Sequence, residues 1–212
     1  MTTDICRSLT IQLAEAIAAL PTDAEQIDAL NAARLALHAI SPFAQEPVDC
    51  VLWVPAATVV ANDYNPNIVA PPEMRLLEIS IAEDGYTQPI VTAHEETQYT
   101  VVDGFHRHKV GLKSKRVQAR IRGYLPVTRI NPDREGRPDR IAATIRHNRA
   151  RGKHTVEGMS SIVLELSRRN WSDKRIGREL GMEPDEVLRL KQITGLAELF
   201  ANREFSEAWE AE

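Results

Sequence analysis

The sequence is poor in cysteine and has no long hydrophobic run. Its 212 residues include two cysteines, Cys6 and Cys50, which lie far apart in the chain. Such sparse thiols exclude a disulfide framework and a zinc site built on cysteine, and they suit a reducing cytoplasm. Nowhere do about 18 consecutive apolar residues occur, and the N-terminus lacks a basic start followed by an apolar core. We therefore expect a soluble, cytoplasmic protein with no membrane partner.

Acidic residues are scarce in one part of the chain, although the formal net charge is only -4. Residues 104–153 hold 15 basic and 3 acidic side chains, whereas residues 1–50 hold 2 basic and 7 acidic ones. A charged stretch is commonly just a solvated face. This one spans several predicted elements, which favours a binding site for an anion such as a nucleotide or nucleic acid.

The N-terminal part has the spacing of two helices. Apolar residues recur at helical intervals on both sides of Pro21-Thr22-Asp23, where Thr22 or Asp23 suits the N-cap of the second helix. We therefore predict a helical hairpin as the first domain, residues 1–46. Its acidic surface carries no cluster of reactive side chains, which favours a role in packing or in oligomerisation.

The middle of the chain mixes strands and helices. Composition and alternation predict strands over residues 48–55, 89–93, 99–102 and 117–124, and helices over about 72–84 and 105–112. After a charged loop rich in proline, we expect helices over about 139–148, 155–169, 172–180, 184–193 and from 195. The predicted fold class is α+β. A small mixed domain, residues 47–130, is flanked by the hairpin and by an all-helical domain, residues 139–212.

An apolar strand runs through a glycine into a basic helix start at Val101-Val102-Asp103-Gly104-Phe105-His106-Arg107-His108-Lys109. A helix N-terminus offers unpaired N–H groups, and glycine lets a phosphate approach the backbone closely. Arg107 can grip two phosphate oxygens, and His106 adds a donor whose charge depends on pH. The alternative is an ordinary turn between strand and helix with an arginine at the surface.

A second cationic cluster ends the predicted helix over residues 139–148. It reads Arg146-His147-Asn148-Arg149-Ala150-Arg151-Gly152-Lys153-His154. One or two cations there would complement the dipole at the helix C-terminus. The cluster holds more than such capping needs, so we favour a second wall of the anion pocket.

Residues 171–190 have the spacing of a helix-turn-helix. Ser172 caps a short helix, Gly181 permits the tight turn and Pro184 starts a second helix. Asp185 and Glu186 are poorly placed beside a polyanion, and the same geometry also occurs as a scaffold. The side chains that could reach DNA phosphates or bases are Lys174, Arg175, Arg178, Arg189, Lys191 and Gln192.

In this order the motifs resemble the ParB N-terminal domain family, in the fold group shared with sulfiredoxin. Residues 62–67 resemble its Asn-Pro-x-Gln-Pro-Arg box, and residues 79–91 its helix, glycine and Gln-Pro-Ile strand. Gly104-Phe105-His106-Arg107 falls where the family has its triphosphate-binding Gly-Glu-Arg-Arg. Residues 147–151 fall where it has Glu-Asn-x-x-Arg, a second phosphate and metal-associated motif. The resemblance covers about residues 48–200 and is strongest to accessory ParB-like proteins, the prophage co-activators called IbrB.

The resemblance implies a nucleoside triphosphate, CTP or ATP, bound with Mg²⁺ that the nucleotide carries. It also implies a homodimer. Gln88 would shape the base side of the pocket, and Asn148 would orient a phosphate or the ion. We expect no metal site of the protein's own. The implied nucleotide-binding residues are Gln88, Gly104, Phe105, His106, Arg107, Asn148, Arg149, Arg151 and Lys153.

Several positions depart from the family pattern. Asp63 and Asn67 replace the proline and the arginine of the first box, and Asn65 stands where the family has a glutamine implicated in hydrolysis. His147 replaces the glutamate of the second motif, which weakens the case for magnesium there. Phe105 occupies the position of sulfiredoxin's cysteine, and without that nucleophile sulfiredoxin chemistry is excluded.

We therefore predict a nucleotide-dependent switch in partition or transcription regulation that engages DNA or a regulatory partner protein. The nucleotide would sit between the Gly104 turn and residues 148–153. The alternative is an enzyme on the same fold, a nucleotide hydrolase or an ATP- or ADP-dependent small-molecule kinase, because residues 103–107 are similar to the Asp-Gly-His-His-Arg of free-serine kinases. It needs a general base, for which Asp103 and Glu78 are the candidates. A nuclease would need a clustered Asp/Glu metal site, which the sequence lacks.

Overall fold

A computed structural model describes residues 2–64, 71–95, 97–131, 133, 136–149 and 156–200 of the chain. At residues 2, 147–149, 156, 157 and 194–200 it describes the backbone alone. The chain divides into two compact units. Unit 1 comprises residues 1–62 and 70–135, and unit 2 comprises residues 63–69 and 136–212.

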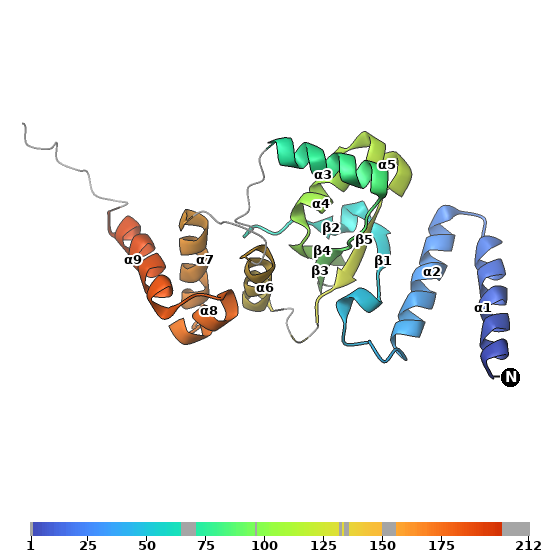
Figure 1. Ribbon diagram of the computed structural model, residues 1–212, viewed down its shortest axis with the longest axis horizontal. Coiled ribbons are helices and arrows are strands. Elements are labelled where there is room, and N and C mark those ends of the chain that lie inside the picture. The colour runs from blue at the N-terminus through green and yellow to red at the C-terminus, as the bar shows by residue number, and fades with distance from the viewer. Residues whose placement is uncertain are drawn as a thin grey trace, which may run out of the picture. The chain divides into compact units, whose positions relative to one another are not determined.

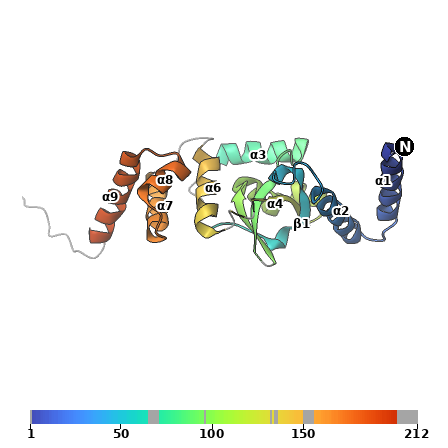
Figure 2. The ribbon, with the colours of Figure 1, turned by 90° about the horizontal axis from the view of Figure 1, so that it is seen from below.

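Unit 1 begins with two helices, α1 (Thr2–Ala18) and α2 (Asp23–His38). The hydroxyl of Thr22 accepts a hydrogen bond from the Glu25 amide at 3.2 Å, and the Glu25 carboxylate accepts one from the Thr22 amide at 3.1 Å. This reciprocal capping begins α2 at the expected break in the hairpin. In two perpendicular views α2 lies between α1 and the first strand, β1 (Leu52–Pro55) (Figures 1 and 2).

A five-stranded sheet forms the centre of unit 1, in the order β1-β5-β3-β4-β2. β3 (Ile90–Glu95) and β4 (Gln98–Asp103) pair antiparallel, and β2 (Val59–Val60) runs parallel to β4. β5 (Tyr124–Arg129) runs parallel to β3 and antiparallel to β1. Consecutive residues are buried at 101–103 of β4 and at 125–128 of β5, so these parts of the strands are covered on both faces.

Three helices cover the sheet: α3 (Pro71–Asp84), α4 (Phe105–Lys113) and α5 (Lys115–Ile121). They pack on one another, and α4 and α5 contact the strands. Short 3-10 turns, η1 (Pro47–Asp49) and η2 (Ala56–Thr58), flank β1. The core between helices and sheet includes Ile81, Ile90, Val101, Val110, Val117 and Leu125.

One side chain of α2 closes the outer edge of the sheet. β1 is an edge strand, and Asn31 bonds the backbone of Trp53 in both directions: its Nδ2 donates to the carbonyl at 2.7 Å, and its Oδ1 accepts from the amide at 3.1 Å. The Trp53 polar groups therefore point away from β5, where the register partner is Pro126. Pro126 also precedes the residues of β5 that pair with β3, so its missing N–H leaves no sheet bond unmade.

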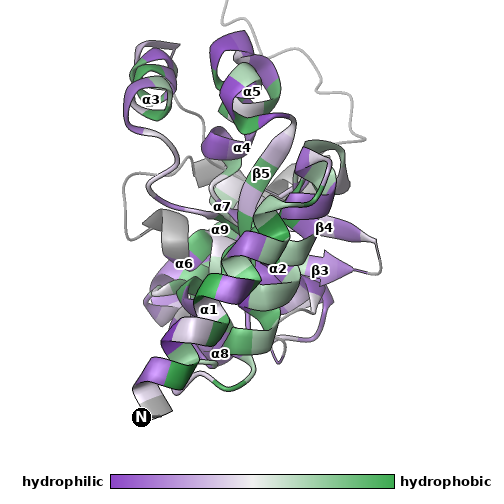
Figure 3. Ribbon diagram, turned by 90° about the vertical axis from the view of Figure 1, so that its right-hand side faces the viewer, coloured by the Kyte–Doolittle hydropathy of each residue, from purple (hydrophilic) through white to green (hydrophobic). Residues whose placement is uncertain are grey.

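The predicted strand over residues 117–124 is wrong. Residues 115–121 form α5, and the strand begins only at Tyr124. Val117 and Ile121 lie one helical turn apart and are both buried, so the alternation in this segment belongs to one face of a helix. In Figure 3 the ribbon of α5 carries both hydrophilic and hydrophobic residues. Gly123, with φ of +80°, then turns the chain into β5.

Unit 2 is helical over its described residues, with α6 (Arg137–Arg149), α7 (Val156–Arg168), α8 (Asp173–Leu180) and α9 (Pro184–Phe200). All four contribute to one core, together with Tyr64 from the segment that precedes α3. The expected break between a helix over 184–193 and a final stretch from 195 is wrong, because α9 is continuous. The core members include Ile141, Ile145, Val163, Leu166, Ile176, Leu180 and Val187.

The predicted α+β class is confirmed: a mixed domain lies between an N-terminal helical hairpin and a C-terminal helical segment in the chain. None of the helices described here combines the length and the apolar character needed to cross a bilayer.

The edge closure by Asn31 leads to a stability prediction. Asn31→Ala removes both bonds to Trp53 and leaves two backbone groups of β1 without that partner, so we expect the free energy of unfolding to fall by about 1–3 kcal/mol. Urea denaturation followed by circular dichroism measures the loss. Asp28→Ala, an exposed position of the same helix, is the control and should change stability by less than about 0.5 kcal/mol. Equal stability of the two variants would contradict this role of Asn31.

Candidate functional site

The turn at Gly104 joins the end of β4 to the start of α4. Gly104 has φ of +87° and is the N-cap of α4, so no side chain caps the first turn of the helix. That first turn also carries no acidic residue. An uncapped and unopposed helix N-terminus of this kind is suited to an anion.

Arg107 folds back over this turn. Its guanidinium donates to the Gln88 Oε1 at 2.9 Å and to the Pro89 carbonyl at 3.2 Å, and it lies 3.4 Å from the Asp103 carboxylate. A Cβ added to Gly104 would lie 2.9 Å from the nearest guanidinium nitrogen. The glycine is therefore needed for the backbone conformation and for the position of Arg107.

Tyr86 fixes the same helix from the side of α3. Its hydroxyl donates to the Arg107 carbonyl at 2.9 Å, and burial raises the pKa of this phenol to about 12. The side chain therefore stays a protonated donor at neutral pH. It also approaches Gly111, where an added Cβ would clash with the Tyr86 hydroxyl and with Leu125.

The aromatic and imidazole side chains of α4 differ in what they offer. Burial of the ring and, to a smaller extent, the charge of Lys109 lower the pKa of His106, which is therefore mostly neutral at pH 7 and can donate through one nitrogen. His108 is buried and lies with Nε2 3.0 Å from the Val59 carbonyl, so its role is structural. Phe105 packs against the core of unit 1, which leaves its backbone amide as the group that can face a ligand.

The two candidate general bases lie in different surroundings. Asp103 is buried, 6% exposed, and its carboxylate lies beside Arg107. Glu78 is exposed on α3 and lies beside the second half of α4, where it lines a depression with Lys109 and Lys113. Neither carboxylate is therefore placed as a general base at the Gly104 turn: Asp103 pairs with Arg107, and Glu78 lies farther along α4.

The second group of nucleotide-binding candidates is described only in part. Asn148 and Arg149 belong to the last turn of α6, where the structure gives the backbone alone. Arg151 and Lys153 lie outside the described residues. Their part in nucleotide binding stays a prediction.

The helix-turn-helix spacing corresponds to α8, a tight turn and α9. The Ser172 hydroxyl accepts a hydrogen bond from the Arg175 amide at 3.2 Å and caps α8. Gly181 has φ of +66°, and a Cβ at Gly177 would lie 2.8 Å from the Met182 carbonyl. Gly181 supplies the left-handed backbone of the turn, and Gly177 permits the close approach of the chain that follows this turn.

The predicted DNA-contacting residues divide into two groups. Arg175 lies over the Trp171 ring at 3.8 Å and 3.6 Å from the Asp139 carboxylate, and Lys191 pairs with Asp173. These two side chains are thus occupied within unit 2. The other four, Lys174, Arg178, Arg189 and Gln192, are exposed, and of these Arg178 lies 3.3 Å from Glu179.

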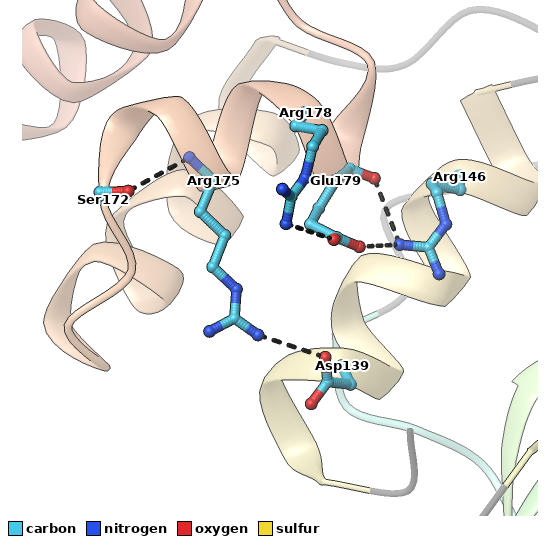
Figure 4. Close-up of polar contacts among 6 residues, drawn as sticks. All are labelled: Asp139, Arg146, Ser172, Arg175, Arg178 and Glu179. Atoms are coloured by element: carbon cyan, nitrogen blue, oxygen red, sulfur yellow. Dashed lines mark hydrogen bonds and ion pairs between the residues drawn. The ribbon is translucent and has the colours of Figure 1, made fainter. Parts of the chain in front are cut away.

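Ion pairs fasten α6 to α8, and Figure 4 shows them with the cap of α8. The Arg146 guanidinium lies 2.6 Å from the Glu179 carboxylate, and Arg175 reaches Asp139. The two residues of the first pair are 33 apart in the chain. The sequence shows only that each predicted helix holds a charged residue, so it does not predict that these two residues meet. Sequence reasoning assigned Arg146 to the cationic cluster and missed its partner.

The described residues contain no group of three His, Cys, Asp or Glu side chains placed to hold a metal ion. Asp103 is the carboxylate nearest the Gly104 turn, and it is engaged by Arg107.

Gly104→Ala should separate backbone strain from the contact with Arg107. Alanine in this left-handed conformation costs about 1–2 kcal/mol, and its Cβ also displaces the guanidinium from Gln88 and Pro89. Gly123→Ala is the matched control, because its φ is +80° and an added Cβ meets nothing within 4 Å. We expect both variants to lose stability in urea denaturation. Only Gly104→Ala should shift the NMR signal of the Arg107 Nε–H, and the same shift in both would contradict the contact.

Comparison with known proteins gives one family match and several similarities. Residues 154–202 match the family described as the IbrB-like C-terminal HTH domain, which confirms the helix-turn-helix and the IbrB-like neighbourhood expected from sequence. The chain is also 56% identical over 202 residues to the Uncharacterized protein YbdM of Escherichia coli (strain K12), and the match covers 95% of each chain.

The similar solved structures include three of ParB proteins. The C-terminally truncated chromosome-partitioning protein ParB of Caulobacter crescentus complexed with CTP-gamma-S has a TM-score of 0.37 at 16% identity, over 71% of this chain and 83% of that one. Its complex with the centromeric parS site has a TM-score of 0.44 at 15% identity, over 67% and 71%. A Pnob8-like ParB-N domain has a TM-score of 0.46 at 12% identity, over 72% and 73%.

The relative's identity and coverage decide the family. With 56% identity over 95% of both chains, and with an IbrB-like helix-turn-helix domain in residues 154–202, the chain belongs to the family of the Escherichia coli protein YbdM.

Proposed function

We propose that the chain is a nucleotide-responsive DNA-binding regulator, acting in partition or in transcription regulation. Its phosphate-binding element is the Gly104 turn, and its DNA-binding element is the pair α8 and α9. The nucleotide is CTP or ATP, carried with Mg²⁺, as the motif resemblance implies.

The Gly104 turn supports the nucleotide part of the proposal. A phosphate at the start of α4 meets the free amides of the first helical turn, the positive end of the helix dipole and the guanidinium of Arg107. Arg107 is already held in place by Gln88 and Pro89, so little side-chain entropy is lost when it binds. Neutral His106 adds one N–H donor.

The regulatory part of the proposal rests on one observation: α6 and the helix-turn-helix share a hydrophobic core. Ile141 and Ile145 of α6 pack in one cluster with Ile176 and Leu180 of α8, and the pairs Arg146–Glu179 and Asp139–Arg175 reinforce this packing. A ligand bound by Asn148 and Arg149 at the end of α6 would therefore bear directly on α8. Occupancy would change how α8 and α9 meet DNA or a partner protein.

The enzyme alternative, a nucleotide hydrolase or an ATP- or ADP-dependent small-molecule kinase, rests on Asp103 or Glu78 as the base. Asp103 lies in an ion pair with Arg107, and Glu78 lies along α4 beside Lys109. The geometry supports binding better than turnover. Measuring phosphate release in the same samples distinguishes the two hypotheses.

Nucleotide binding is tested by calorimetry with CTP, ATP, GTP and ADP in magnesium. We expect one nucleotide to bind, and Arg107→Ala to weaken it by about tenfold or more, since hydrogen bonds to charged groups contribute about 1.5–3 kcal/mol. Lys115→Ala, which removes an equal charge from an exposed position of α5, should leave the affinity within about twofold. Arg151→Ala tests the second motif. Binding of none of the four nucleotides would refute this half of the proposal.

DNA binding is tested by fluorescence anisotropy with a short duplex at several salt concentrations. Arg178→Ala and Arg189→Ala should weaken binding, and each should reduce the slope of log K against log salt by about 0.9, because each removes one phosphate contact. Arg175→Ala is the contrasting variant. It loses the stacking on Trp171, so we expect it to lower stability and to leave the slope nearly unchanged. Wild-type slopes for Arg178→Ala and Arg189→Ala would contradict the assigned interface.

A further inference from the structure

Residues 104–132 contain no aspartate or glutamate and eight lysines and arginines. The structure accounts for four of the arginines within unit 1. Arg107 is held at the Gly104 turn, Arg116 pairs with Glu83 at 2.7 Å, and Arg122 pairs with Asp23. Arg120 donates to the Ala82 carbonyl at 2.8 Å and to the Ile81 carbonyl, at the end of α3.

The lysines of the same segment are differently placed. Within the described part of the chain, Lys109, Lys113 and Lys115 make no hydrogen bond or ion pair, and all three are exposed. Two of them, Lys109 and Lys113, are one helical turn apart on α4 and line a depression of about 180 Å³ between α3 and α4. Arg75 of α3 lines it from the opposite side.

The charge of this depression is positive. Its charged lining residues are Arg75, Lys109, Lys113 and Glu78, which leaves an excess of two positive charges. Arg75 likewise makes no ion pair among the described residues. Cations that converge on a hollow without carboxylates to neutralise them all favour an anionic ligand.

A buried hydroxyl points to the same conclusion. Ser114 also lines the depression and is 6% exposed, and its Oγ finds no hydrogen-bond partner among the described residues. Ser114 is the N-cap of α5, where serine ordinarily accepts a bond from the helix backbone, but no such bond forms here. A buried hydroxyl without a partner is costly, and a ligand oxygen in the depression would supply one.

We propose that the depression between α3 and α4 is a second phosphate-binding site, formed by Arg75, Lys109, Lys113 and the hydroxyl of Ser114. It lies along the second half of α4, whereas the Gly104 turn lies at the start of that helix. The ligand is a phosphate group, carried either by a free phosphate ester or by the backbone of a nucleic acid. The site stands independently of nucleotide binding at Gly104.

The test uses the full chain, with inorganic phosphate and a short DNA duplex as the two probes. Amide NMR signals of Lys113 and Ser114 are followed during each titration at low salt. Lys113→Ala and Ser114→Ala remove two groups of the site, and Lys115→Ala is the control, because it removes the same charge two residues away from Lys113 and does not line the depression. Circular dichroism checks that each variant is folded.

If free phosphate esters are the ligand, inorganic phosphate shifts these signals. Lys113→Ala should then weaken the affinity for phosphate by about tenfold and Ser114→Ala by about threefold, whereas Lys115→Ala should change it by less than about twofold. If a nucleic acid is the ligand, the duplex shifts the same signals. Lys113→Ala then lowers the salt slope of DNA binding by about 0.9, and Lys115→Ala does not. Either result supports the site.

The proposal is overturned if Lys113→Ala and Lys115→Ala behave alike with both probes. A negative result for the depression can also be told apart from a negative result for nucleotide binding at the Gly104 turn. Arg107→Ala should weaken nucleotide binding by about tenfold or more and leave the shifts at Ser114 intact, because Arg107 does not line the depression.

Discussion

The left-handed backbone at Gly104 is the constraint on which unit 1 depends. It ends β4 with the buried carboxylate of Asp103 and starts α4 without a capping side chain. Because the residue has no Cβ, the guanidinium of Arg107 can lie close above the turn and reach Gln88 and Pro89. The direction of α4 is set at the same point, so the turn also determines where Lys109 and Lys113 stand relative to α3.

The features that sequence reasoning predicted have local signals. The break before α2, the glycine between β4 and α4, and the cap and tight turn of the helix-turn-helix are each encoded within a few residues. The positions of Thr22, Gly104 and Ser172 could therefore be interpreted correctly without the structure. The ParB-like order of motifs pointed to the IbrB-like proteins, whose C-terminal helix-turn-helix family matches residues 154–202.

The features that it could not predict depend on residues far apart in the chain. Val117 and Ile121 fit either a strand or a helix, and only packing against the sheet decides for α5. Pro126 lacks the N–H that an inner strand usually needs, so the sequence argues against a strand at this position. The proline is tolerated because Trp53, its register partner on β1, bonds to Asn31 and not to β5. The cations of α8 and α9 looked alike in sequence, yet Lys191 is paired with Asp173, 18 residues away.

The side chain of Asn31 gives the N-terminal hairpin a second significance. An edge strand with free backbone groups is a template on which another polypeptide can add a strand, and proteins commonly cover such edges. Here a helix from outside the sheet covers β1 through one amide that imitates a neighbouring strand at Trp53. At Trp53, α2 thus occupies the backbone groups to which a strand from another molecule would bond.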